Sequence, residues 1–398
     1  LPWANAWTAW DRVRIESDQE FLLKGQKFEQ VLRLHADGEA VWRLPKGTKK
    51  VSGHFSGVSH GLVQPIVYLT NEALPLTGIH KEKVVELRFP IGKTGSYSDT
   101  YPKDCPKSEV TVTRHTVWLA AQQRENGSWP RLSGYTADGW DTAWCALALM
   151  SSGDSKYDEQ VRKAAYYVGY ETAPSEWTAE RSMRLLFLSE YYLRTKDTKI
   201  LAAIQASYRQ LEACCKTDNM AGHKVNGFGY GIAGQHYGTG HMALAFAVAS
   251  KTPIETNGDL VKDVIRHAGE VCVNGTYAYG RGRRFARDDS RKHGGGNTMI
   301  GPGMLGAMIA GGHQSSIDEV IERWEASVGD ADNSHATSSL GFILASLAMA
   351  VENEEVFLKS MQNFKYKMTI DDNWEGGFLK SSFALNLQSG DGVVANWS

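Results

Sequence analysis

The 398-residue chain carries 43 basic and 45 acidic side chains, so its formal net charge is −2. This balance gives no electrostatic attraction toward nucleic acid or an anionic membrane, and we expect neither partner. No apolar run reaches the roughly 20 residues that a membrane-spanning helix needs. The chain is long enough for a large core and one to three domains. Its twelve tryptophans and sixteen tyrosines suit stacking on sugar rings, although large cores also use them.

The five cysteines form no CxxC metal signature, and their odd number leaves at least one thiol unpaired within the chain. No spacing demands zinc, although His236 and His241 are conceivable ligands. We therefore expect no metal and no cofactor. The chain begins with leucine and shows no signal-peptide pattern, which fits either a processed secreted protein or a trimmed sequence. We expect a secreted or periplasmic protein that is a monomer or a small homo-oligomer.

The first hundred residues differ from the rest of the chain. Strand-like runs at 28–42, 64–70 and 83–89 are punctuated by Gly and Pro. The segment 96–106 is interpreted as a linker that leads into helical territory. We therefore expect a small β-rich N-terminal region over residues 1–98 and a mainly α domain over residues 99–398.

From Ser108 onward the helical period dominates. Short connectors between the predicted helices alternate with mostly longer ones that are rich in Gly, aromatic and charged residues. Helices that pair up and down place alternate connectors at opposite ends, so an α/α toroid of six or seven helix pairs would gather the long loops around one mouth. The predicted helices are 108–123, 139–152, 156–170, 177–195, 198–216, 239–250, 258–273, 298–312, 315–327, 336–352 and 355–366.

One short motif supports this architecture. Trp118-Leu119, then Gln123, then Gly127-Ser128-Trp129 follow a spacing that resembles the one found in α/α-toroid proteins such as terpene cyclases. In those proteins the Gln and Trp tie successive helix pairs together. The motif indicates architecture and says little about chemistry.

The segment from Asn226 to His241 holds six glycines among aromatic and imidazole side chains and leads into an apolar helix. So many glycines favour a backbone that comes close to another group. His236 titrates near neutrality and is a candidate base. Tyr237 donates a proton easily but needs a nearby cation to act as a base near neutral pH. The alternative is that both side chains pack against the helix start.

A second cluster, Tyr277 to Asn297, concentrates arginine between Gly and Tyr. Arginine binds carboxylates through two parallel hydrogen bonds, which favours an anionic substrate over the alternative of a solvated surface. Asp288 and Asp289 are interpreted as partners of the adjacent arginines rather than as a metal or carbocation site. Candidates for catalysis here are Tyr279, Arg284, His293 and Asn297, and candidates for substrate binding are Arg281, Arg283 and Arg287.

Further binding candidates lie near the other long connectors. Trp140 and Trp144 are four residues apart, so they share one face of a helix. Core packing is the default for these aromatic residues, and sugar stacking is the alternative. The substrate-binding candidates of this group are Arg131, Tyr135, Trp140, Trp177, Arg181 and His335.

The segment 97–108 (Tyr-Ser-Asp-Thr-Tyr-Pro-Lys-Asp-Cys-Pro-Lys-Ser) resembles the opening of a bacterial α/α-toroid family that is often preceded by a PDZ-like domain. The segments 147–154, 227–241, 277–297 and 332–339 follow in the same order as in that family, over roughly residues 96 to 350. The chain is thereby similar to polysaccharide lyase family thirty-eight, whose members cleave β-glucuronan or alginate. Residues 1–98 do not show the ligand-binding loop of the PDZ pattern.

The resemblance implies β-elimination on a uronic-acid-containing polysaccharide. A base removes the proton at C5, and cationic or hydrogen-bonding groups neutralise the enolate-like charge. One alternative is a glycoside hydrolase on the same scaffold, which needs two carboxylates. The other alternative is a non-catalytic carbohydrate-binding protein. The carboxylate candidates for a hydrolase are Asp141, Glu180, Asp288 and Asp372.

Overall fold

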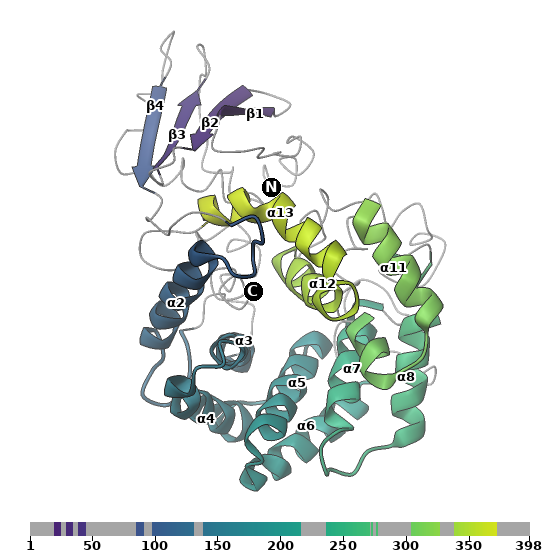
Figure 1. Ribbon diagram of the computed structural model, residues 1–398. Helices are drawn as coiled ribbons and strands as arrows, with labels where there is room; N and C mark the ends of the chain where they lie inside the picture. The colour runs from purple at the N-terminus through teal and green to yellow at the C-terminus, as the bar shows by residue number, and fades with distance from the viewer. Residues whose placement is uncertain are drawn as a thin grey trace. The chain divides into compact units, whose positions relative to one another are not determined.

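The computed structural model (Figure 1) describes residues 98–130, 138–215, 236–270, 304–326 and 338–371, together with six strand segments among the remaining residues. The chain divides into two compact units, which are described separately. One comprises Leu1–Trp118 and Phe357–Gly392, and the other comprises Leu119–Val356 and Val393–Ser398. The expected domain boundary near residue 98 stays a prediction. Within the described residues, no helix has the length and apolarity that crossing a membrane requires.

In the first unit, four strands form an antiparallel sheet in the order β1-β2-β3-β4. Glu20 is opposite Arg33 in the first pairing, and Glu39 is opposite Pro90 in the last. Most of residues 1–98 lie outside the described part, so the expected β-rich region stays a prediction. The strands are β1 (Glu20–Lys24), β2 (Glu29–Leu34), β3 (Glu39–Leu44) and β4 (Val85–Pro90).

The segment before helix α2 (Pro106–Ala121) is an ordered turn. The Ser98 N–H donates to Cys105 Sγ at 3.4 Å, and Thr100 Oγ1 donates to the Lys103 carbonyl at 2.9 Å. Gln362 lies on α13 (Glu354–Asp371) and donates from Nε2 to the carbonyls of residues 99 and 101 at 3.3 and 3.1 Å. The segment interpreted as a linker therefore binds the last described helix to the start of α2.

The described part of the chain is mainly helical. The predicted helices are found in the described residues, with boundaries that differ by several residues at some ends. Two differences have a local cause: the outer helices at 155–166 and 198–212 each open with a 3₁₀ turn, and the first continues as a π-helix over Tyr167–Glu171. The helices of the second unit are α3 (Asp138–Ser151), α4 (Asp158–Tyr166), α5 (Thr178–Thr195), α6 (Leu201–Glu212), α7 (His236–Ala249), α8 (Gly258–Glu270), a stretch at 304–310, α11 (Gln314–Ala326) and α12 (Ser338–Glu352).

Within the second unit the helices form two layers (Figure 1). Helix α5 packs between α3 and α7, while α4, α6 and α8 each pack against the helix that precedes them. Every residue from 238 to 249 of α7 is buried, as in a helix surrounded on all sides. Helix α8 instead buries one face and exposes the other, as an outer helix does. This is an α/α arrangement; the closed ring of six or seven pairs stays a prediction.

The short connectors from inner to outer helices repeat one capping device. Gly153 and Lys196 adopt positive φ values of 71° and 57°, which reverses the chain. The next residue, Asp154 or Asp197, then caps the following turn by accepting a backbone N–H two residues later, at 3.0 and 3.1 Å. Asn257 Oδ1 caps α8 through the N–H of residue 260 at 3.2 Å. These caps fix the direction in which each outer helix starts.

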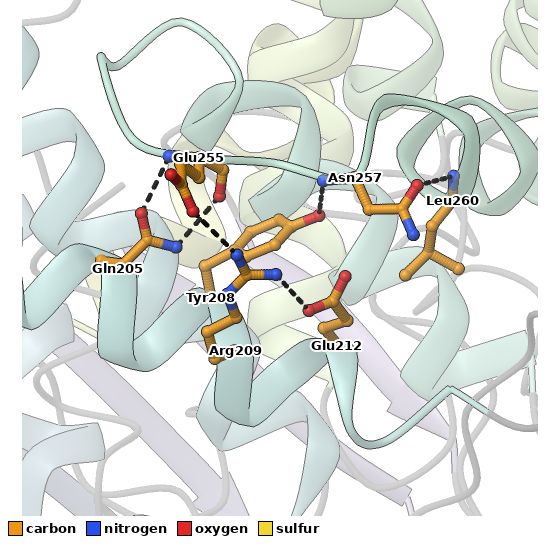
Figure 2. A network of polar contacts seen from close by, with 7 residues as sticks. All are labelled: Gln205, Tyr208, Arg209, Glu212, Glu255, Asn257 and Leu260. Atoms are coloured by element: carbon orange, nitrogen blue, oxygen red, sulfur yellow. Dashed lines mark hydrogen bonds and ion pairs between the residues drawn. The ribbon is translucent and has the colours of Figure 1, made fainter.

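Figure 2 shows how one of these connectors is held against α6. Gln205 exchanges two hydrogen bonds with the backbone of Glu255, at 2.8 and 3.0 Å. The Asn257 N–H donates to the buried Tyr208 Oη at 2.8 Å, and Arg209 bridges Glu212 and Glu255 at 2.9 and 3.2 Å. The exposed ion pairs add little stability. The hydrogen bond to the buried Tyr208 oxygen contributes more to stability than these ion pairs, because the backbone N–H of Asn257 would otherwise lose its acceptor.

The Gln-Gly-Trp motif ties α2 to the next helix pair, as its spacing predicts. Gln123 Nε2 donates to the carbonyls of Gly127 at 3.0 Å and of Gln160 on α4 at 2.8 Å. In return, Gln160 Nε2 donates to the Ala120 carbonyl at 2.9 Å. The Trp129 indole N–H donates to the Leu119 carbonyl at 2.8 Å, and its ring is fully buried. Two side-chain amides and one indole thus link the end of α2 to the following loop and to α4.

Gly127 gives a stability test with a matched control. Its φ is +88°, and an added Cβ would lie 2.6 Å from the Lys163 carbonyl carbon and oxygen. Gly153 has a similar φ of +71° but open space around it. We expect Gly153→Ala to lower the free energy of unfolding by about 1 kcal/mol through backbone strain. Gly127→Ala adds a backbone clash and should cost about 3 kcal/mol or more. Urea unfolding measures both, and equal losses would contradict the proposed close approach.

Candidate functional site

The inner helices of the second unit start at a common end. Short connectors make α3 and α4, α5 and α6, and α7 and α8 antiparallel pairs, so α3, α5 and α7 run in one direction. Their first residues are Asp138, Thr178 and His236. Much of the connecting chain at this end lies outside the described residues. The described part of the candidate site therefore consists of the first turns of these helices.

His236 and Tyr237 form the first turn of α7. Position 237 lies one turn before His241 on the same helix face, and His241 is 2% exposed. Position 236 instead shares a face with Ala243, which the stretch at 304–310 approaches so closely that a Cβ on Gly306 would lie 3.3 Å from the Ala243 Cβ. As consecutive residues, positions 236 and 237 are separated by about 100° around the helix axis.

Helix α3 brings an aromatic pair and a buried carboxyl group to the same end. Trp140 is half-buried and meets the fully buried Trp144 edge to face, with ring centroids 5.9 Å apart. Asp141 is 1% exposed. Burial raises the pKa of the Cys145 thiol one turn later, and the charge of Asp141 adds to that shift. Trp144 is a core residue, whereas Trp140 keeps an exposed part that a ligand can contact.

Helix α5 begins beside α7 with Trp177 as its N-cap residue. Trp177 is half-buried. Arg181, one turn further on, donates from Nε to the Ser175 carbonyl at 2.5 Å and from Nη1 to the Gln210 carbonyl at 2.8 Å. These donors contact backbone carbonyls of this chain. The substrate-binding role expected for Arg181 stays a prediction, but its described contacts are structural ones.

Sequence reasoning missed a half-buried carboxyl group, Glu190, on α5. Burial raises its pKa above the usual range, and it forms no ion pair with any residue in the described ranges. It lies on the helix face of Met183 and Leu186, both buried. The only sequence signal is a glutamate at a position where the helical period calls for an apolar residue.

Most of the remaining candidates lie outside the described residues. Whether the His-Tyr turn meets the arginine-rich segment therefore stays a prediction. Among the described residues, no group of three or more His, Cys, Asp or Glu side chains is arranged to hold a metal ion. The candidates that the structure does not describe are Arg131, Tyr135, Tyr279, Arg281, Arg283, Arg284, Arg287, Asp288, His293, Asn297, His335 and Asp372.

Several solved structures share this fold. A family 76 glycoside hydrolase from a bovine Bacteroides thetaiotaomicron strain is 10% identical, with a TM-score of 0.54 over 94% of this chain and 86% of that one. An unsaturated glucuronyl hydrolase specific for heparin is 11% identical, with a TM-score of 0.51 over 72% and 94% of the two chains. An inactive α-1,6-mannanase variant of Salegentibacter sp. HEL1_6, bound to α-1,6-mannotriose, is 10% identical, with a TM-score of 0.50 over 72% and 97%. At such identities the likeness shows the fold alone.

At the level of sequence, the model of one protein family matches residues 111–391. Its description is a domain of unknown function, DUF6288. No curated protein matches the chain. The resemblance to polysaccharide lyase family thirty-eight and to a PDZ-like domain is not among these matches and stays a prediction.

The raised pKa of Glu190 predicts that the stability of the protein depends on pH. Because its folded-state pKa is raised, the folded state holds the proton more tightly than the unfolded state. The wild-type protein should therefore lose stability as pH rises from the usual glutamate pKa of 4.5 through the raised value. Glu190→Gln removes this loss, so its unfolding midpoint should exceed that of the wild type at neutral pH and approach it in acid.

The measurement is urea unfolding of both proteins from about pH 4 to about pH 8. Glu171→Gln, which changes an exposed carboxyl group on the neighbouring π-helix, is the control. Parallel wild-type and Glu190→Gln curves over this range would show that Glu190 is not desolvated.

Proposed function

The chain belongs to this family of unknown function, DUF6288, and we propose that it is a polysaccharide lyase that cleaves a uronic-acid-containing polymer of the glucuronan or alginate type by β-elimination. One observation carries the proposal: His236 and Tyr237 occupy the first turn of α7, an inner helix of an α/α fold. The fold likeness to a glucuronyl hydrolase and to glycoside hydrolases supports a substrate made of sugars.

The chemistry fits a helix start. A base takes the proton from C5, the C4–O bond breaks, its electrons leave with the oxygen, and a C4–C5 double bond forms as the leaving oxygen gains a proton. Negative charge gathers on the uronate carboxylate during this step. The positive end of the helix dipole at the first turn of α7 favours such an anion. Arg284, His293 and Asn297 are the proposed further neutralising groups.

His236 and Tyr237 are the proposed acid–base pair, with Tyr279 as a second acid candidate. A neutral imidazole is a competent base near neutral pH. The phenol of Tyr237 supplies the proton to the leaving oxygen, and it also serves as the base if a nearby arginine lowers its pKa. Which of the two takes the C5 proton is left to the experiment below.

Two half-buried tryptophans extend the proposed binding surface. Trp140 stands in the first turn of α3 and Trp177 at the N-cap of α5, and α5 packs against α7. A flat aromatic face that is partly exposed suits the apolar face of a sugar ring. Helices α3, α5 and α7 are neighbours in that order. We therefore expect Trp140, Trp177 and the His236–Tyr237 turn to contact successive sugar units of a polymer.

A glycoside hydrolase on the same scaffold is the second candidate. Asp141 supports it, because a carboxyl group lies in the first turn of α3, at the helix end where the candidate site is proposed. Glu180 stands in the equivalent first turn of α5. The mannanase of similar fold was made inactive by replacing two aspartates. Hydrolysis would yield new reducing ends without unsaturation.

The deciding experiment incubates the protein with glucuronan, alginate and neutral glycans. We expect ultraviolet absorbance of an unsaturated uronate with one of the uronic polymers and none with the neutral ones. Mass analysis identifies the product. Reducing ends of ordinary mass would favour the hydrolase, and saturable binding without product would favour a carbohydrate-binding protein.

Substitutions then test the acid–base pair. We expect Tyr237→Phe and His236→Ala each to lower kcat/KM by about 10²- to 10⁴-fold, because each removes a group that moves a proton. Tyr192→Phe, on the far end of α5, is the matched control and should retain activity. If both site variants turn over like the wild type, the chemistry belongs to the segment 277–297 instead.

A further inference from the structure

We propose that Arg181 is a positioning residue that fixes the starts of α5 and α7 against each other, rather than a residue that binds substrate. The kinetic part of this inference rests on the proposed function. The structural part does not, because it concerns contacts between described residues of the second unit.

Arg181 joins two segments that are distant in sequence. Its Nε donates to the Ser175 carbonyl, in the connector that enters α5, at 2.5 Å. Its Nη1 donates to the Gln210 carbonyl, in the last turn of α6, at 2.8 Å. A guanidinium presents its donors in a fixed, planar fork, so satisfying both carbonyls sets the direction as well as the distance between the segments. Hydrogen bonds from a charged donor are also stronger than neutral ones.

Sulfur contacts continue this connection to α7. Arg181 Nη1 lies 3.8 Å from Cys214 Sγ, and the Cys214 thiol donates to the Gln210 carbonyl at 3.3 Å. The next residue, Cys215, places its Sγ 3.3 Å from the Sδ of Met242, a fully buried residue of α7. Met242 follows His241 and stands about one and a half turns after Tyr237. The connector into α5, the end of α6 and the start of α7 thus form one continuous set of contacts.

A neighbouring arginine, Arg184, also donates hydrogen bonds to backbone carbonyls before α5 and to α6. Arg184, three residues later on α5, donates to the carbonyls of Gly169 and Thr172 at 2.9 Å and to the Ser207 hydroxyl of α6 at 3.1 Å. Burial, together with the charge of Arg181, lowers the pKa of this guanidinium. Two arginines at i and i+3 therefore hold the chain that enters α5 against α6. An arginine that binds substrate would instead present its fork to the ligand.

The consequence for the site is geometric. Trp177 belongs to the segment that Arg181 holds, whereas His236 and Tyr237 stand on α7. Loss of Arg181 would let these two parts of the site shift, and a displacement of about 1 Å is enough to lower turnover by up to 100-fold. Affinity for an anionic polymer would change little, because the guanidinium does not contact it.

The experiment compares Arg181→Gln, Arg181→Lys and Arg194→Gln. Arg194 is the matched control: it also lies on α5 and donates to the backbone carbonyl of Met150 on α3, but at the opposite end of the helix. Lysine keeps the charge but lacks the planar fork, so it cannot satisfy both carbonyls in the same geometry. Amide hydrogen exchange is measured on peptides 206–215 and 236–246, and kinetics are measured on the polymer that the lyase assay identifies.

We expect exchange in both peptides to rise about tenfold or more in Arg181→Gln, less in Arg181→Lys, and not at all in Arg194→Gln. We expect kcat to fall by up to about 100-fold with KM within about twofold.

Unchanged exchange overturns the proposal whether or not the protein is a lyase. A raised KM at constant kcat, with unchanged exchange, assigns Arg181 to substrate binding. Absence of lyase activity in the wild type, with raised exchange in Arg181→Gln, refutes the proposed function and leaves the positioning role standing.

Discussion

The buried surface of α7 is the constraint on which the rest of the second unit depends. A helix buried at every residue from 238 to 249 has to be enclosed by apolar neighbours on all sides. Helix α5 supplies one side and α8 another, and the stretch at 304–310 comes close enough that a Cβ on Gly306 would lie 3.0 Å from the α7 backbone. Two layers of helices follow from this requirement, because a single row would leave α7 exposed.

The two ends of the helix pairs differ in how often local caps hold them. At the end with short connectors, Asp and Asn side chains cap the outer helices locally, and the buried Tyr208 oxygen of α6 accepts an N–H from the connector before α8. At the other end, the guanidinium groups of Arg181 and Arg184 reach between segments that local caps do not link. Local caps favour one geometry whatever surrounds them. Long side chains allow the connecting chain to vary in length and composition, and that is the end at which the candidate acid–base residues stand.

The helices and the Gln123–Trp129 motif could be predicted from the sequence, because the helical period and a fixed spacing reflect local structure. The partners of Arg181 could not be predicted, because they are backbone carbonyls, which every residue has whatever its side chain. Glu190 was missed for a related reason. A single polar residue on an apolar helix face does not indicate a special role until its burial is known from the structure. The side-chain placement at positions 236 and 237 depends on contacts beyond the described residues, so their chemistry stays a prediction.

The bond from Gln362 to the Tyr101 carbonyl spans 261 residues of sequence. Contacts of such long range form slowly, because the chain between them has to be ordered first. During synthesis the turn at 98–105 emerges long before its partner on α13, and domains tend to fold from the N-terminus as they are made. The start of α2 therefore lacks this partner until another 261 residues of the chain have been made.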